Sequence, residues 1–169
     1  MVQKNECERE NYYRVLGRLG GVRVWKYVCR DYVRFSSKVD NVEKWKVFIS
    51  RSNGSGKYGE KLSKIEIAGP GDIHTDSFIS SGNFETQQEA ENLRKYLKTK
   101  FARALLGIRK STQDLRPDCM ALIPDQDFSP SSDIDWEKPI PDIDRQLYVK
   151  YGLDGRAVDF IEKHVKEDL

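Results

Sequence analysis

The hydrophobic positions of this chain are most regular between Thr86 and Ile108. Apolar residues recur there at steps of three and four, the spacing that puts them on one face of an α-helix. They are Ala90, Leu93, Leu97, Phe101, Ala104, Leu105 and Ile108. Thr86 precedes Glu89 by three residues, the spacing of an N-terminal capping box. The pattern predicts one helix of about six turns, with an apolar side long enough to lie on a sheet.

The remaining surface of this predicted helix is basic. It carries Arg94, Lys95, Lys98, Lys100 and Arg103. A basic helix surface either faces water or contacts the phosphates of a nucleic acid, and the pattern leaves both possibilities open.

A β-hairpin is predicted near the N-terminus. Two largely apolar runs, Tyr12–Leu19 and Val22–Val33, flank Gly20-Gly21, a pair typical of a tight turn. In the second run, one side of the strand holds Val22, Val24, Lys26 and Val28, and the other holds Arg23, Trp25, Tyr27 and Cys29. The aromatic side with its arginine fits either the inside of a two-layer core or a surface on which bases stack.

The rest of the chain predicts short elements. Further strands are expected over Trp45–Ser50, Leu62–Ala68, Thr75–Ser80 and Cys119–Pro124. Residues 125–141 are rich in Pro, Ser and Asp and predict an irregular loop that Trp136 fixes to the surface. Short helices are expected at 142–151 and 154–165, separated by Gly152. The predicted fold class is α+β, a mostly antiparallel sheet with one long packed helix and a C-terminal helical hairpin.

The 169 residues predict one domain. A polar N-terminal segment, residues 1–11, precedes a domain over 12–169. Residues 12–124 would form the sheet and the long helix, 125–141 the loop, and 142–169 the helical hairpin.

Charge divides the chain into two parts. Residues 1–110 hold 22 Lys and Arg against 13 Asp and Glu, a net charge of +9, whereas residues 111–169 hold 7 against 14, a net charge of −7. A basic body favours a polyanionic partner. The sequence contains no run of about 18 apolar residues and no signal peptide, and its three cysteines are widely spaced. We therefore expect reduced thiols, a cytoplasmic location and no membrane partner.

Residues 54–59 match the pattern G-x-G-x-x-G. A dinucleotide site requires a helix after the third glycine, but the following LSKIEIA predicts a strand, and Tyr58 replaces the Ser or Thr of a phosphate-binding P-loop. We therefore exclude nucleotide binding. The loop is then either a solvent-exposed connection or a flexible DNA contact, in which Arg51, Asn53 and Lys57 would reach base edges.

Catalytic and metal-binding patterns are absent from the sequence. A nuclease site would need Glu-x-Lys after Pro-Asp, and none of the pairs at 117–118, 124–125 and 141–142 is followed by it. The acidic run Asp125, Asp127, Asp133 and Asp135 lacks the spacing of a calcium loop. No Asn-Pro-Pro-Tyr motif of an adenine methyltransferase occurs. We expect neither enzyme activity in this chain alone nor a bound metal.

Three segments resemble bacterial restriction-modification proteins. YLKTKFARALLGIRKSTQD (96–114), ALIPDQDFSPSSDIDW (121–136) and DIDRQLYVKYGL (142–153) are similar to the C-terminal target-recognition region of Eco57I-like adenine-specific DNA methyltransferases. VRVWKYVCRDYV, WKVFISRSNGSGKYGEK and HTDSFISS are similar to earlier parts of that region. The resemblance covers nearly the whole chain after about residue 10.

The resemblance implies a DNA target-recognition domain whose catalytic domain lies elsewhere in the parent protein. Its expected partners are double-stranded DNA and that methyltransferase domain, and S-adenosylmethionine would bind only to the latter. From their chemistry, the candidate DNA-binding residues are Arg51, Ser52, Asn53, Ser55, Lys57, Tyr58, Arg23, Trp25, Lys98 and Lys110. The alternative function is a protein–protein docking or specificity module that uses the acidic C-terminal hairpin.

Overall fold

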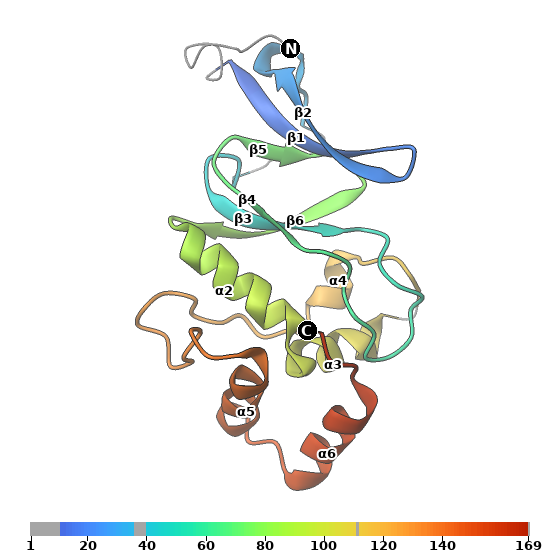
Figure 1. Ribbon diagram of the computed structural model, residues 1–169, viewed down its shortest axis with the longest axis vertical. Coiled ribbons are helices and arrows are strands. Elements are labelled where there is room, and N and C mark those ends of the chain that lie inside the picture. Colours follow the sequence, from blue (N-terminus) through green and yellow to red (C-terminus); the bar gives the residue numbers. More distant parts are fainter. Residues whose placement is uncertain (1–10, 36–39, 111, 169) are drawn as a thin grey trace.

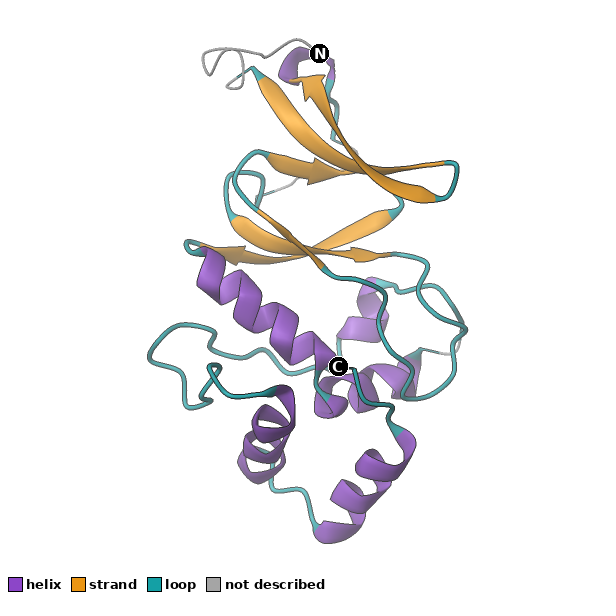
Figure 2. Ribbon diagram, in the orientation of Figure 1, coloured by secondary structure: helices purple, strands orange, loops and turns teal. Residues whose placement is uncertain are grey.

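The computed structural model describes residues 11–35, 40–110 and 112–168. Two small sheets and a set of helices follow one another along the longest axis of the molecule (Figures 1 and 2). The strands are β1 (Tyr12–Leu19), β2 (Val22–Cys29), β3 (Trp45–Ser50), β4 (Glu66–Ala68), β5 (Asp72–His74) and β6 (Phe78–Phe84). The helices are η1 (Arg30–Tyr32), α2 (Gln87–Lys98), α3 (Lys100–Arg109), α4 (Pro117–Met120), α5 (Ile140–Lys150) and α6 (Gly155–His164). The predicted α+β class and mostly antiparallel pairing are confirmed, but the strands form two small sheets where one was expected.

The first sheet has the order β2-β1-β5, with β1 antiparallel to β2 and parallel to β5. Its hairpin turns at Gly20 and Gly21, whose φ values of 56° and 81° lie in the left-handed region that glycine adopts at little cost. The predicted hairpin is therefore confirmed, but β2 ends at Cys29, and the short helix η1 replaces the last residues of the expected strand.

The second sheet has the order β4-β3-β6 and is antiparallel throughout. Its central strand β3 is buried on both sides, so its side chains alternate between two cores. Phe48 faces the first sheet and packs with Leu16, Ala68, Phe78 and Trp25. On the aromatic side of β2, Trp25 thus lies in a two-layer core, whereas Tyr27 is 59% exposed.

The main core lies on the opposite side of the second sheet. Val47 and Ile49 of β3 pack there with apolar side chains from α2, α3 and the C-terminal helices. Figure 1 shows α2 beneath the strands β3 and β6, as the apolar spacing of the helix predicts. The capping box at Thr86 and Glu89 forms as predicted.

The expected continuous helix is broken at Thr99. This residue has φ −61° and ψ 150°, outside the helical region, and it ends α2 and begins α3. Its hydroxyl accepts a hydrogen bond from the amide of Ala102 and donates one to the carbonyl of Tyr96. The carboxylate of Asp144 accepts the amides of Lys100 and Phe101 at 3.0 and 2.9 Å. These two caps satisfy the amides that the break releases.

Other predicted boundaries also need correction. The run Cys119–Pro124 does not form a strand, because Pro117 opens the short helix α4 and a turn follows it. Residues 62–65 lie outside β4, and the strand expected over Thr75–Ser80 is displaced to Phe78–Phe84, with the separate strand β5 before it.

The C-terminal part agrees with the prediction. Helices α5 and α6 are joined by a turn at Gly152, which has φ 61°. Trp136 fixes the irregular loop, because its indole is 4% exposed and donates hydrogen bonds to the carbonyl of Asp127 and to the hydroxyl of Ser132. Among the described residues, no helix has both the length and the apolar character needed to cross a membrane.

Candidate nucleic-acid interface

Two arginines converge on one hydroxyl at the tip of the hairpin. The two-residue turn sets Arg18 of β1 opposite Arg23 of β2. Arg18 and Arg23 both donate to Ser50 Oγ, at 3.0 and 2.9 Å. The guanidinium groups of Arg18 and Arg23 also lie 5.6 and 5.5 Å from the centre of the Phe78 ring. We call Arg18 and Arg23, which share the hydroxyl of Ser50, the arginine pair.

The arginine pair has an excess of positive charge. Arg23 also donates to the Lys64 carbonyl at 2.5 Å, and Glu66 lies 3.4 Å from Arg23 and 2.9 Å from Lys64. One carboxylate therefore serves two cations. Arg18 is exposed and makes two hydrogen bonds through a group that has five donors, so it can still bind an anion.

Arg51 follows Ser50 directly in the chain. Its side chain is half exposed and pairs with Asp76 at 3.2 Å, and Asp76 itself is 95% exposed. An ion pair this open to solvent contributes little stability and exchanges readily with another anion. Arg51 therefore remains accessible, and its contact with DNA stays a prediction.

The glycine-rich loop folds around its own carboxylate. Glu60 accepts the amides of Ser55 and Gly56, both at 2.8 Å, and pairs with Lys110 Nζ at 2.6 Å. Burial alone would raise the pKa of Glu60, but the hydrogen bonds from Lys110 and the two amides outweigh it and lower the pKa to about 2. The loop amides that would otherwise suit a phosphate are thus already occupied.

Two predicted contact residues are buried and need correction. Asn53 is 2% exposed, and its side-chain oxygen accepts the amide of Ser63 at 2.9 Å. Lys110 is 5% exposed and neutralises Glu60. A buried side chain cannot reach a base edge, so both residues hold the loop in place.

The remaining loop residues divide between surface and interior. Ser52, Ser55 and Lys57 are exposed, and the hydroxyl of Ser55 donates to Glu60. Tyr58 is half-buried, lies against Gly107 of α3, and has its ring 5.7 Å from that of Phe160. Tyr58 therefore anchors the loop to the helices, whereas Lys57 remains accessible.

Trp25 and Lys98 both contact other side chains of the protein. Trp25 packs on Phe48 between the two sheets, and the Arg14 guanidinium stacks 4.3 Å from its ring centre. Lys98 lies 3.8 Å from Asp168. Trp25 is therefore not a surface for DNA in this conformation, which corrects that prediction, whereas the Lys98 side chain is 32% exposed and its contact with DNA stays a prediction.

The basic side of α2 and α3 is covered by later parts of the chain. Lys95 donates to the Trp136 carbonyl, and Lys100 pairs with Glu162 at 2.5 Å. Arg103 is 2% exposed and donates to the carbonyl of Lys166 at 2.5 Å. At Lys100 and Arg103 neither alternative from the sequence, water nor phosphate, accounts for this surface, because the acidic C-terminal segment lies on these two side chains.

Comparisons with models of protein families, with curated proteins and with solved structures found no match. The described residues also contain no group of three or more His, Cys, Asp and Glu side chains placed to hold a metal ion.

Of the predicted residues, the structure thus leaves Arg51, Ser52, Ser55 and Lys57 on the surface and places Arg23 in the arginine pair. Arg18 and Ser50 were missed. The signal for Arg18 was present in the sequence, because a two-residue turn at Gly20-Gly21 places residue 18 opposite residue 23. Arg23 already makes four hydrogen bonds through Nη1 and Nη2, so Arg18 is the arginine that retains donors, and a guanidinium with free donors can bind a phosphate with two parallel hydrogen bonds.

Proposed function

We propose that this chain binds double-stranded DNA and acts as the target-recognition domain of an adenine-specific restriction-modification methyltransferase. The observation that carries the DNA-binding part is the convergence of Arg18 and Arg23 on Ser50, beside a single carboxylate, Glu66, that pairs with both Arg23 and Lys64. Arg18 and Arg51 would contact phosphates. Ser52 and Lys57 on the adjoining loop would approach a groove of the DNA duplex. The assignment to a methyltransferase is supported by the sequence resemblance.

A salt titration of the intact chain with a fluorescein-labelled duplex tests the DNA-binding part. Each lost phosphate contact reduces the slope of log affinity against log salt by about 0.9. Arg18→Ala should therefore weaken binding about five- to tenfold near 0.1 M salt. It should also reduce the slope by about 0.9, the contribution of one phosphate contact. Arg18 is exposed, so the variant should remain folded.

Arg156→Ala is the matched control, because Arg156 is also exposed but lies on α6. It should bind the duplex with the affinity and salt slope of the wild type. Wild-type affinity and slope in both Arg18→Ala and Arg51→Ala would refute the assigned interface. The methyltransferase part predicts an S-adenosylmethionine-binding domain in the same reading frame upstream of Met1, and a frame without one would refute that part alone.

A further inference from the structure

A concave surface lies at the start of α2, between this helix and the loop after α4. Its cavity measures about 830 Å³, compared with about 540 and 580 Å³ for two cavities lined by strand residues of both sheets. Phe128, Ile134 and Trp136 form an apolar floor. Cavities of this size and character accommodate ligand groups in other proteins. We call this surface the acidic groove.

The walls of the groove carry charge of one sign. They contain Glu85, Glu89, Asp133, Asp135 and Glu137, and no Lys, Arg or His is among the lining residues that the structure describes. Such walls repel phosphate, so they exclude nucleic acid as the occupant. Two of the amides at the start of α2 are already used by the capping box of Thr86 and Glu89, which reduces what this helix end could offer an anion.

Three of these carboxylates are already near cations on the outside of the groove. Glu85 pairs with Lys44, Asp133 pairs with Lys150 at 2.7 Å, and Asp135 lies 3.8 Å from Lys138. Glu89 and Glu137 have no cationic partner within the described part of the chain. These two side chains therefore supply the charge that a bound cation would neutralise.

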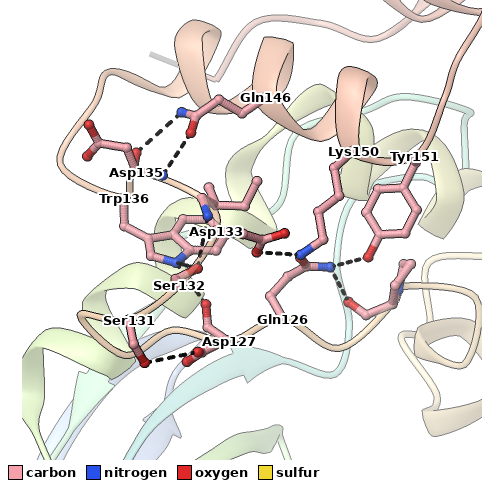
Figure 3. A network of polar contacts seen from close by, with 12 residues as sticks. Gln126, Asp127, Ser131, Ser132, Asp133, Asp135, Trp136, Gln146, Lys150 and Tyr151 are labelled. Atoms are coloured by element: carbon pink, nitrogen blue, oxygen red, sulfur yellow. Dashed lines mark hydrogen bonds and ion pairs between the residues drawn. The ribbon is translucent and has the colours of Figure 1, made fainter.

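The groove is formed before any partner binds. Figure 3 shows that α5 holds the loop at two points. Gln146 accepts the amide of Asp135 at 2.8 Å and donates to its carbonyl, and Lys150 donates to Gln126 at 3.0 Å and to Asp133 at 2.7 Å. The indole Nε1–H of Trp136 donates to the Asp127 carbonyl and to the Ser132 hydroxyl, which fixes the ring to its own loop. A wall fixed in this way loses little conformational entropy on binding.

We propose that the acidic groove docks a segment of a partner protein in which cationic side chains alternate with apolar ones. The apolar side chains would rest on Phe128 and Trp136, and the cationic groups would lie between Glu89 and Glu137. Charge complementarity selects this occupant, because an acidic segment or a nucleic acid would place like charges together. The proposal is independent of DNA binding by the arginine pair.

Titration of the ¹⁵N-labelled intact chain with the capped hexapeptide Gly-Arg-Leu-Arg-Leu-Gly tests the proposal. The indole N–H signal of Trp136 and the side-chain amide signals of Gln88 and Gln146 should shift in a saturable manner. Glu89→Gln with Glu137→Gln should weaken binding about three- to tenfold, since each exposed carboxylate contributes modestly. Glutamine preserves the capping box, so the double variant should remain folded.

Three controls complete the experiment. Asp159→Asn removes an exposed carboxylate on α6 and should leave peptide affinity unchanged. The peptide with Glu in place of Arg should not shift the groove signals, and the peptide with Gly in place of Leu should bind more weakly. The proposal is overturned if the arginine–leucine peptide leaves the groove signals in place, if the glutamate peptide shifts them equally, or if the double variant binds like the wild type.

Discussion

Glu60 shows at the scale of a single residue how this chain uses a charge that would otherwise be costly. Its carboxylate neutralises Lys110, whose side chain is 4% exposed, and accepts two loop amides. The loop therefore depends on an internal anion for its conformation. The same contact explains why Lys110, predicted to bind DNA, is unavailable to it.

Glu60→Gln should lower the free energy of unfolding at pH 7 by about 2–4 kcal/mol, because Lys110 would remain buried without its counter-charge. The pKa of Glu60 in the folded chain, about 2, lies below its ordinary value of 4.5. Its stabilisation is therefore present above pH 4.5 and is lost as the pH falls towards 2. Urea denaturation at several pH values should show this decline in the wild type and less of it in the variant.

The control is Glu91→Gln, since Glu91 lies on α2 and accepts one hydrogen bond, from Gln87. That change should alter stability by less than about 0.5 kcal/mol. A Glu60→Gln protein as stable as this control would show that the loop does not depend on its carboxylate.

At the scale of elements, the separation of α2 from α3 depends on a residue in a distant helix. Asp144 of α5 is 3% exposed and accepts the amides of Lys100 and Phe101. Burial raises the pKa of Asp144 to about 6, although these hydrogen bonds oppose the shift. The cap is therefore a carboxylate that titrates under mildly acidic conditions.

Asp144→Asn should remove this titration. A carboxyl group whose pKa is raised on folding adds stability below its ordinary pKa of 3.8, and that stability is lost as the pH rises through 6. The wild type should therefore gain about 2–3 kcal/mol relative to the variant between pH 7 and pH 4. Thermal unfolding of both proteins across this range measures the difference, and parallel curves would contradict the assignment.

An element could be predicted from the sequence when the residues that determine it lie close together in the chain. The hairpin and the capping box arise from residues within a few positions of one another, and both were predicted. The break at Thr99 was missed because Leu97 and Phe101 continue the apolar spacing across it, while its cap, Asp144, lies 44 residues from Lys100. Asn53 likewise looked available for DNA because its partner Ser63 belongs to another segment.

At the scale of the whole molecule, much of the charge asymmetry is neutralised internally. Lys100 pairs with Glu162, and Lys98 lies near Asp168, so the acidic C-terminal segment covers the basic side of the central helices. Exposed positive charge on Arg18 at the hairpin tip and negative charge along the acidic groove remain available to partners. The glycine-rich loop is joined to the C-terminal segment, because the carbonyl of Gly59 accepts the amide of Lys166 at 3.0 Å.

Gly59→Ala tests this connection between segments that are distant in sequence. Gly59 has φ +68°, and a Cβ atom there would lie 2.6 Å from the His164 carbonyl oxygen and 2.8 Å from the Val165 Cα. The backbone strain costs about 1 kcal/mol, and the clash adds about 1–3 kcal/mol because backbone atoms would have to move. Chemical denaturation should show the combined loss, and limited proteolysis should cleave the C-terminal segment faster.

Gly152→Ala separates the two contributions. Gly152 has a similar φ of +61°, but a Cβ atom there would have no neighbour within 4 Å. This variant should lose only the cost of the left-handed backbone, about 1 kcal/mol, and its C-terminal segment should resist protease like that of the wild type. Equal losses in the two variants would mean that the C-terminal segment moves aside freely. A larger loss in Gly59→Ala would mean that the loop and the C-terminal segment stabilise each other, because the two glycines differ chiefly in what surrounds them.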